Sequence, residues 1–240
     1  MKLGIIGGLG PLATAYYYEL LTKMSDVHCD QEHLEILIHS HPQIPDRTEY
    51  IFNHNKENPV HDLINTAQKL QDQGVDYLTI PCTTAHYFYK EISQTIHIPI
   101  IHLVNEVCEY LDRKSIQCVG IMATSGTIIA ELFQKELDKR GIKYIIPNET
   151  LQKDVMYLIY KNIKCGIPIE MERFDNISQY LFNKGAEIII LGCTELSLIK
   201  KEKHLNKKYL DVLELLSAVA LSKCHMNIKE EYCYLIDEGD

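Results

Sequence analysis

The sequence predicts an α/β protein made of two similar lobes, each with a parallel sheet of the four-stranded type flanked by helices. The strongest indication is a repeat, because residues 74–84 and 185–195 each run from a glycine through a short apolar stretch to a Cys-Thr pair. Residues 4–10 and 120–126 also match, at a similar separation. Apolar strands alternate with helical segments of ten or more residues, which is typical of parallel sheets with right-handed crossovers. We therefore expect two lobes related by a pseudo-two-fold axis, with a cleft between them.

The first half begins with a strand at residues 3–7, which a glycine-rich turn connects to a helix from Pro11 to about Met24. Proline suits this first turn because its missing N–H would have no partner there. A strand at 34–40 precedes a loop at 41–48, in which two prolines exclude a regular helix. The other expected elements of this half are a helix at 61–73, the strand before Cys82, a helix at 85–94, a strand at 98–102 and a helix at 104–112.

The second half repeats this alternation. Its expected elements are a strand at 117–122, a helix at 128–140, a strand at 143–147, helices near 151–164 and 170–183, and a strand at 187–191. Residues 208–225 form a long amphipathic segment, which we expect to be a helix that packs back on the first lobe. We therefore assign residues 1–103 and 209–240 to the first lobe and residues 104–208 to the second.

Composition excludes several classes of function. The 240 residues carry 24 Lys and Arg against 33 Asp and Glu, a formal net charge of −9, and show no lysine-rich segment, so we expect no nucleic-acid partner. The eight cysteines are scattered without CxxC pairs, which indicates a reduced setting and no disulfide framework. The chain begins with a strand and a glycine loop in place of a signal peptide, and no apolar run in the sequence reaches membrane-spanning length. We therefore expect a cytoplasmic protein without a membrane partner.

The Cys-Thr pairs are the residues best suited to chemistry. Cys82 and Cys193 each follow a buried strand and precede a helix, which places both thiols at the carboxyl edge of a sheet, where open α/β folds bind ligands. The positive end of the following helix favours thiolate over thiol. One such cysteine is more often a small buried apolar residue, but two at matching places in facing lobes can flank one small molecule. Such a pair can remove a proton from one face of a carbon and return a proton to the other.

Neighbouring threonines and glycines have a structural and a functional interpretation. Thr83, Thr84 and Thr194 suit either helix capping or the binding of a carboxylate at the helix ends. The glycine loop at 7–10 lacks the spacing of a dinucleotide fingerprint and the Lys-Ser/Thr of a P-loop. We expect this loop to allow the close approach of a small ligand.

Five segments together resemble those of the aspartate/glutamate racemase family, and specifically its aspartate racemase branch. They span nearly the whole chain in the expected order: residues 7–14 (GGLGPLAT), 44–48 (IPDRT), 81–86 (PCTTAH), 123–127 (ATSGT) and 192–196 (GCTEL). The resemblance implies a racemase that uses no cofactor and no metal and encloses its substrate between two lobes. It further implies a homodimer that acts on a small acidic amino acid.

The resemblance also implies roles for individual residues. Cys82 and Cys193 match the acid/base pair, and we expect Cys82 to deprotonate the D enantiomer and Cys193 the L enantiomer. Arg47 and Lys164 fall where the aspartate branch places cations for the distal carboxylate, although Lys164 also suits a helix-end lysine that satisfies the dipole. The residues expected to hold the α-carboxylate are Thr84, Thr124 and Thr127. The residues expected to complete the pocket are Gly10, Thr83 and Thr194.

Substrate identity stays open at this point. Thr83 stands where the family commonly has Asn, and His41 replaces an Asn commonly seen before the proline loop. The main expectation is interconversion of L- and D-aspartate. The alternatives are racemisation of glutamate or a broader set of amino acids, thiol-based isomerisation of a dicarboxylic acid, and noncatalytic capture of an amino acid between the lobes. His86 either packs at the rim or tunes the thiol, and Glu195 either assists Cys193 or caps its helix.

Overall fold

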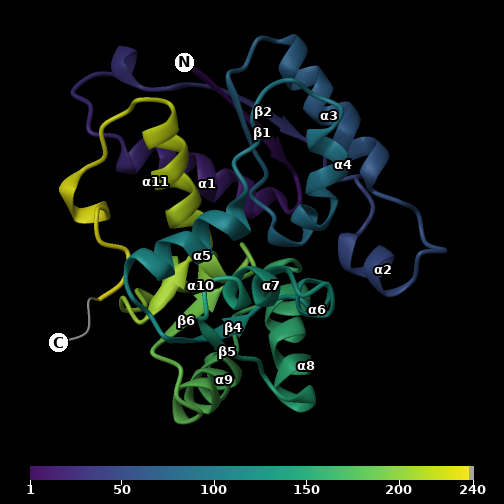
Figure 1. Cartoon of the computed structure of the whole chain (residues 1–240), viewed down its shortest axis with the longest axis vertical. Helices are drawn as coiled ribbons and strands as arrows, with labels where there is room; N and C mark the ends of the chain where they lie inside the picture. Colours follow the sequence, from purple (N-terminus) through teal and green to yellow (C-terminus); the bar gives the residue numbers. More distant parts are fainter. Residues whose placement is uncertain (238–240) are drawn as a thin grey trace.

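The computed structural model describes residues 1–237 and contains two parallel sheets, one in each lobe (Figure 1). The first sheet has the order β2-β1-β3 and the second the order β5-β4-β6-β7. Their strands are β1 (Lys2–Gly7), β2 (Glu35–Ser40), β3 (Tyr77–Thr79), β4 (Cys118–Met122), β5 (Lys143–Ile145), β6 (Ile188–Leu191) and β7 (Tyr209–Asp211). All neighbouring strands are parallel, which confirms the predicted α/β fold with two similar lobes.

Helices surround both sheets. Those whose sequence accompanies the first sheet are α1 (Pro11–Met24), α2 (Arg47–Phe52), α3 (Val60–Asp72), α4 (Tyr89–Ser93) and α5 (Leu103–Arg113). The second sheet is accompanied by α6 (Ser125–Ile129), α7 (Leu132–Asp138), α8 (Glu149–Tyr157), α9 (Met171–Asn183), α10 (Leu196–Lys203) and α11 (Val212–Lys223). Helical turns η1 (Asp30–Glu32), η2 (Thr83–Phe88), η3 (Leu158–Ile163) and η4 (Glu230–Tyr232) complete the described elements.

The two sheets repeat one strand order, in which β1, β2 and β3 correspond to β4, β5 and β6. The strand expected at 98–102 would correspond to β7, but it is reduced to a single parallel bridge between Leu78 and Ile100. Its backbone still forms two hydrogen bonds with Leu78, from Leu78 N to Pro99 O and from Ile101 N to Leu78 O. Pro99 has no N–H to donate, so the ladder cannot extend through it. The first sheet is therefore three-stranded, with a rudimentary fourth position.

Three helices differ from the sequence-based prediction. The segment at 85–94 begins as the 3₁₀ turn η2, and the segment at 128–140 divides into α6 and α7 at Glu131, whose φ is 56°. The segment at 208–225 begins as the strand β7 before α11 starts at Val212. Asp211 causes this start, because its carboxylate accepts hydrogen bonds from the backbone N–H groups of Leu213 (2.8 Å) and Glu214 (3.4 Å).

Two glycines allow close backbone approaches that shape the region between the sheets. Gly8 has a φ of +89°, and a Cβ there would lie 2.5 Å from the backbone nitrogen of His41. Gly126, at the start of α6, lies against Thr48 of α2, and a Cβ there would lie 2.8 Å from the Thr48 hydroxyl oxygen. These contacts bring the glycine loop, the 41–48 segment and α6 together where the two lobes meet.

One apolar core joins the lobes. It includes Leu3 and Ile5 of β1, Val119 and Ile121 of β4, and side chains of α1, α5, α7 and α11. Helix α11 lies beside α1 (Figure 1), as expected for a helix that packs back on the first lobe. The lobe boundaries at 103 and 209 stay a prediction, while β7 pairs with β6 of the second sheet.

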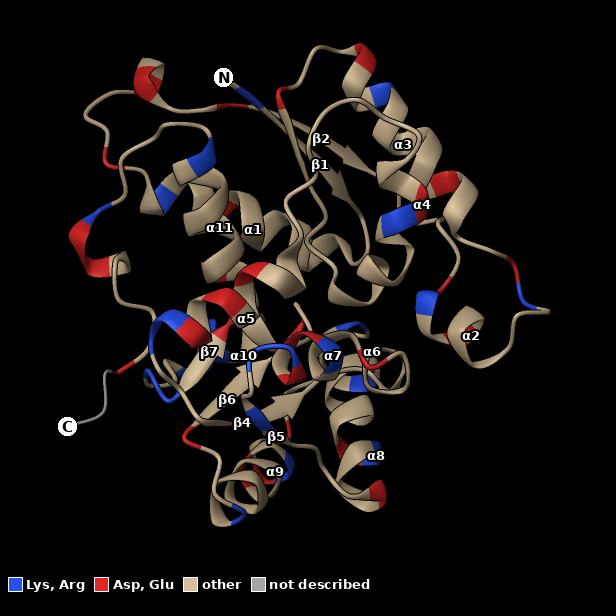
Figure 2. Ribbon diagram, viewed as in Figure 1, with Lys and Arg blue, Asp and Glu red and all other residues tan. Residues whose placement is uncertain are grey.

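Charged residues of both signs are spread along the ribbon of both lobes (Figure 2). Many of them form ion pairs within one helix, as Lys23 does with Glu19 and Lys153 with Glu149. Among residues 1–237, no helix combines the length and the apolar character that crossing a bilayer requires.

Candidate active site

Both strand-end cysteines line one small pocket between the lobes. Cys82 follows β3 and directly precedes the turn η2, whereas Cys193 lies between β6 and α10, and each is only 6% exposed. The first lobe contributes Leu9, Asp46, Arg47, Thr48, Cys82, Thr83 and Thr84 to this inner pocket, and the second contributes Thr124, Tyr160, Lys164, Cys193, Thr194 and Glu195. The repeated strand-to-turn pattern thus places its two thiols in one site, as the sequence predicts.

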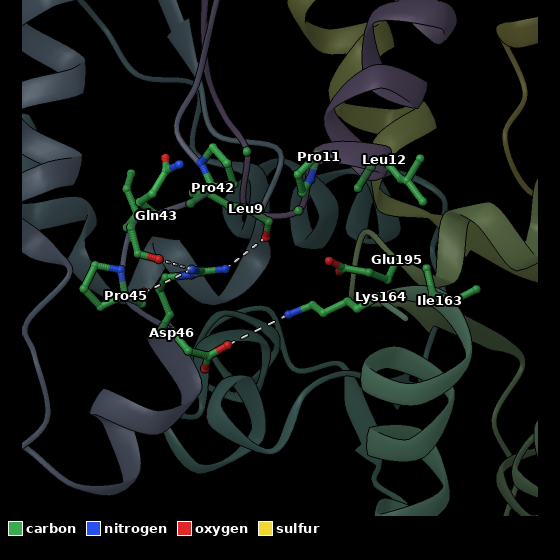
Figure 3. Close-up of a pocket in the computed structure, with 15 residues that line it drawn as sticks. Leu9, Pro11, Leu12, Pro42, Gln43, Pro45, Asp46, Ile163, Lys164 and Glu195 are labelled. Atoms are coloured by element: carbon green, nitrogen blue, oxygen red, sulfur yellow. Dashed lines mark hydrogen bonds and ion pairs between the residues drawn. The ribbon is translucent and has the colours of Figure 1, made fainter. Parts of the chain in front are cut away.

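A larger outer chamber of about 540 Å³ adjoins the inner pocket (Figure 3). The glycine loop and the segment from Pro42 to Arg47 form one side of it, and Ile163, Lys164 and Glu195 form the other. The wall residues shared by both spaces are Leu9, Asp46, Arg47, Lys164 and Glu195. The inner pocket has a volume of about 10 Å³, about the least that can hold one water molecule, so an amino acid enters only if these shared side chains move apart.

Burial and Glu195 together favour the protonated form of Cys193. The Cys193 thiol donates a hydrogen bond of 2.9 Å to Glu195 Oε2, which also accepts from the Thr194 hydroxyl at 3.3 Å. Burial raises the pKa of Cys193 well above its ordinary value, and the negative charge of Glu195 and the hydrogen bond raise it further, while Lys164 opposes them. Cys193 is therefore held as a neutral thiol in this structure. Of the two interpretations of Glu195, the geometry favours assistance to Cys193.

We expect alkylation to report this protonation state. At pH 8, iodoacetamide should modify Cys193 more slowly than the exposed Cys29, because only the thiolate reacts and a raised pKa leaves little of it. Glu195→Gln leaves the burial of Cys193 in place but removes the charge that raises its pKa further, so alkylation of Cys193 should accelerate by about threefold or more. Peptide mapping by mass spectrometry measures each rate. An equal acceleration at Cys82 would instead mean that the substitution opens the pocket.

Arg47 lies in the wall beside Cys82, with 7% of its surface exposed. Its Nη1 donates to the carbonyl oxygens of Ile44 (3.2 Å) and Pro45 (3.0 Å), and Nη2 donates to that of Leu9 (3.0 Å). Its Nε is buried without a partner and is an unused donor, while Cys82 is a further side-chain partner of the guanidinium. Burial lowers the pKa of Arg47, but Cys82 and Asp46 outweigh this and raise it overall. Arg47 therefore remains a cation.

Arg47 lies in a helix, although the sequence predicts a loop at residues 41–48. It is the first residue of α2, and the preceding Asp46 caps this helix by accepting a hydrogen bond from the Glu49 N–H at 3.0 Å. The prolines therefore fix the segment that leads into α2. The Arg47 guanidinium in turn binds the carbonyl groups of Ile44 and Pro45 in that segment.

Asp46 connects the two lobes. Its carboxylate accepts hydrogen bonds from the Tyr160 hydroxyl at 3.0 and 3.3 Å, and Lys164 Nζ lies 3.9 Å from Asp46 Oδ2 (Figure 3). Lys164 also stacks on the Tyr160 ring at 4.0 Å. Burial alone would raise the pKa of Asp46, but the Glu49 amide and the cations Arg47 and Lys164 lower it. Asp46 is thus an anion, and each of its oxygens already faces a protein donor.

Three threonine hydroxyls form a triangle across the interface between the lobes. Thr84 lies 2.9 Å from Thr124 and 3.0 Å from Thr127, and Thr124 donates to Thr127 at 3.1 Å. Thr84 and Thr124 line the inner pocket, whereas Thr127 is fully buried and lies behind them. Thr83 also lines the pocket, and its buried hydroxyl has no partner.

The structure brings most of the predicted site residues together. Gly10 borders only the outer chamber, and Thr127 lines neither space. The sequence reasoning did not assign Asp46, Thr48, Tyr160 or Leu9 to the site. Tyr160 could have been found, since it precedes Lys164 by four residues and so shares its helix face. The partnership of Asp46 with Tyr160 joins positions far apart in the chain and leaves no local signal.

His86 supports Cys82 through the backbone. It is buried, its Nδ1 lies 3.1 Å from the Cys82 carbonyl oxygen, and its Nε2 accepts a hydrogen bond from the Leu103 N–H at 3.1 Å. These contacts fix a neutral ring with the proton on Nδ1. Burial lowers the pKa of His86 to about 3, with a smaller contribution from His102. His86 is therefore neither a rim residue nor a partner of the thiol.

Donors for a metal ion are not gathered anywhere in the part of the chain that the structure describes, since no group of three or more His, Cys, Asp or Glu side chains has a suitable arrangement. The inner pocket instead combines two cations, two carboxylates, hydroxyls and two thiols. This set suits a small zwitterion that carries carboxylates and an amino group.

Fold and site together define a two-lobed α/β protein with one thiol from each lobe facing a single buried pocket. The family model for Asp/Glu/hydantoin racemases matches residues 6–220, so the chain belongs to this family. It is 27% identical over 206 residues to the broad-specificity amino-acid racemase RacX of Bacillus subtilis, covering 82% of this chain and 86% of that protein.

Two solved structures extend the comparison. The aspartate racemase of Picrophilus torridus superimposes with a TM-score of 0.84 at 26% identity and covers 98% of both chains. An aspartate racemase homologue from Pyrococcus horikoshii gives a TM-score of 0.75 at 25% identity, over 93% of this chain and 99% of that one. These similarities confirm the family and the fold that the sequence motifs predict.

Proposed function

We propose that the protein interconverts L- and D-aspartate without a cofactor, by a two-cysteine acid/base reaction. The observation that carries this proposal is that Cys82 and Cys193, one from each lobe, line the same buried pocket together with Arg47 and Lys164. The family and the likeness to an aspartate racemase support a racemase of an acidic amino acid.

The charges around the two thiols support a division of roles. The cation Arg47 interacts with Cys82, where the reaction needs a thiolate, and the carboxylate Glu195 holds Cys193 as a thiol. Cys82 then takes the α-proton from D-aspartate, and the Cys193 thiol gives its proton to the opposite face of the carbanion. Afterwards Cys82 is the thiol and Cys193 the thiolate, which is the state that accepts L-aspartate. The two thiols therefore exchange their protonation states in each turnover.

Substrate groups are assigned from the positions of the donors. Thr84 and Thr124 present hydroxyls for the α-carboxylate, with Thr127 supporting them from behind. The free Nε–H of Arg47 and the ammonium of Lys164 bind the distal carboxylate. The unpartnered hydroxyl of Thr83 and the neighbouring Thr194 complete the inner pocket.

A second candidate is racemisation of glutamate or of a broader set of amino acids. The outer chamber of about 540 Å³, directly beside the cysteines, favours it, because a longer side chain could extend there. The relative RacX, whose name states broad specificity, points the same way. Noncatalytic binding of an amino acid is the alternative from another class, but binding alone requires no pair of thiols. A homodimer in the cytoplasm stays a prediction.

A chiral assay tests the proposal. Protein that has been dialysed exhaustively against a chelator should convert either enantiomer of aspartate to an equal mixture, without added pyridoxal phosphate or metal. Prior alkylation of the thiols should abolish this activity. Glutamate and alanine assayed in parallel decide the range of substrates. Activity that returns only on addition of pyridoxal phosphate or a divalent metal would contradict the proposed mechanism, and no turnover of any amino acid would favour the binding module.

A further inference from the structure

We infer that Glu195 is the substrate-binding residue for the α-ammonium group, which it receives on its Oε1 atom while Oε2 holds Cys193. This inference rests on the proposed function, since it concerns the same pocket, and it assigns the substrate group that the other site residues leave unpaired. It predicts that the site selects amino acids over the corresponding acids without an amino group.

The charge balance of the pocket requires an anion for the substrate. An amino acid brings an ammonium group as well as carboxylates, and a buried ammonium is costly unless it is paired. Arg47 and Lys164 repel it, and the threonine hydroxyls carry no charge. Among the described residues that line the inner pocket, the carboxylates are those of Asp46 and Glu195.

Asp46 is already occupied by protein groups. Its Oδ1 accepts hydrogen bonds from the Glu49 N–H at 3.0 Å and the Tyr160 hydroxyl at 3.3 Å, and its Oδ2 accepts from Tyr160 at 3.0 Å and faces Lys164. These contacts also join the lobes. An ammonium at Asp46 would have to compete with Lys164 for the same oxygen.

Glu195, in contrast, has an unused oxygen. The residue is 3% exposed, and its Oε1 is buried with no hydrogen-bond partner, although a buried carboxylate oxygen normally has one. Glu195 lines both the inner pocket and the outer chamber, into which it projects (Figure 3). A Cβ at position 10 would lie 3.2 Å from Oε1, so a side chain in place of Gly10 would crowd this oxygen on the side of the glycine loop.

The arrangement also positions the reacting carbon. The amino nitrogen is bonded directly to Cα, so an ammonium on Oε1 brings Cα next to the thiol that Oε2 holds. The ammonium at the same time neutralises the carboxylate charge that, together with burial, favours the thiol form of Cys193. Substrate binding would thus prepare Cys193 for its turn as the base, and an acid without an amino group would not.

Binding measurements test the inference. In calorimetric titrations, wild-type protein should bind racemic aspartate at least about 10-fold more tightly than succinate or malate, which lack the ammonium. Glu195→Gln keeps the shape of the side chain and can still accept a hydrogen bond from Cys193. It should weaken the binding of aspartate about 10-fold or more and change the affinity for succinate less than about threefold. Glu202→Gln, an exposed residue of α10, is the matched control and should change neither affinity.

Two outcomes would overturn the inference: wild-type protein that binds succinate as tightly as aspartate, and equal losses for both ligands in Glu195→Gln. The wild-type comparison decides the matter even where the variant fails to fold, which its circular dichroism melting curve reports. Because binding needs no turnover, the result is separate from the proposed function. If wild-type protein binds aspartate selectively but does not racemise it, the proposed racemase activity is wrong and the role of Glu195 stands. If the protein racemises aspartate and Glu195→Gln binds aspartate normally, the proposed activity stands and the role of Glu195 is wrong.

Discussion

Cys82→Ala and Cys193→Ala should each lower racemisation of aspartate by on the order of 10³-fold, because a proton that leaves one face and returns to the other needs a group on each side. Both thiols line the same pocket at the edge of an apolar cluster, and each substitution removes only one sulfur atom, so the variants should fold. The measurement is the rate at which optical rotation is lost from each pure enantiomer. Full activity in either variant would rule out the two-base reaction.

The same variants separate the two thiols by isotope exchange in deuterium oxide. Cys193→Ala retains the base proposed for D-aspartate, so it should exchange the α-hydrogen of that enantiomer without inverting it, and Cys82→Ala should do so for L-aspartate. Cys108→Ala is the control, since Cys108 is fully buried in the apolar core and outside the pocket. It should lower the free energy of unfolding by about 1 kcal/mol and leave both reactions intact. Exchange of the opposite enantiomers would reverse the assignment of hands.

The fold could be predicted because its signals are local and repeated. The alternation of apolar strands and helices, and the duplicated approach to each cysteine, correspond to the shared order of β1, β2, β3 and β4, β5, β6. The missing strand at 98–102 depends on Pro99, whose lack of an N–H ends the ladder on one side of the Leu78–Ile100 bridge, and on Leu103, whose N–H binds His86 on the other. The start of α11 likewise depends on the capping carboxylate of Asp211, which a pattern of apolar residues does not indicate.

The site could be predicted where a residue lies at a strand end and not where its role depends on distant partners. Cys82, Cys193 and their threonines follow from the carboxyl edges of parallel strands. The hydrogen bonds that Arg47 donates to three backbone carbonyl groups could not be inferred, because these groups come from the glycine loop and the proline segment. Glu195 was visible beside Cys193 in the sequence, but the burial of its second oxygen without a partner is a property of the assembled pocket.

Arg47→Lys should lower kcat/KM for aspartate by on the order of 10-fold or more, equivalent to about 1.4 kcal/mol. A lysine ammonium carries three N–H groups on one atom, so it cannot bind the carbonyls of Leu9, Ile44 and Pro45 and also offer a planar edge to a carboxylate. Alanine has no distal carboxylate, so any turnover of alanine should decrease less. The ratio of the two losses isolates the contribution of Arg47 to the distal carboxylate.

Stability must be measured alongside these rates, because the substitution also leaves buried carbonyl groups without donors, at a cost of about 1–3 kcal/mol in the free energy of unfolding. Arg140→Lys is the matched control: Arg140 binds the Glu136 carbonyl at 2.9 Å and the Asn105 side chain at 2.7 Å but lines neither space of the site. The Arg140→Lys variant should lose stability, and its kcat/KM for aspartate and for alanine should change to the same extent. If Arg47→Lys behaves in the same way, with equal losses for both substrates, Arg47 holds the glycine loop and the proline segment in place, and Lys164 alone would have to select the dicarboxylate.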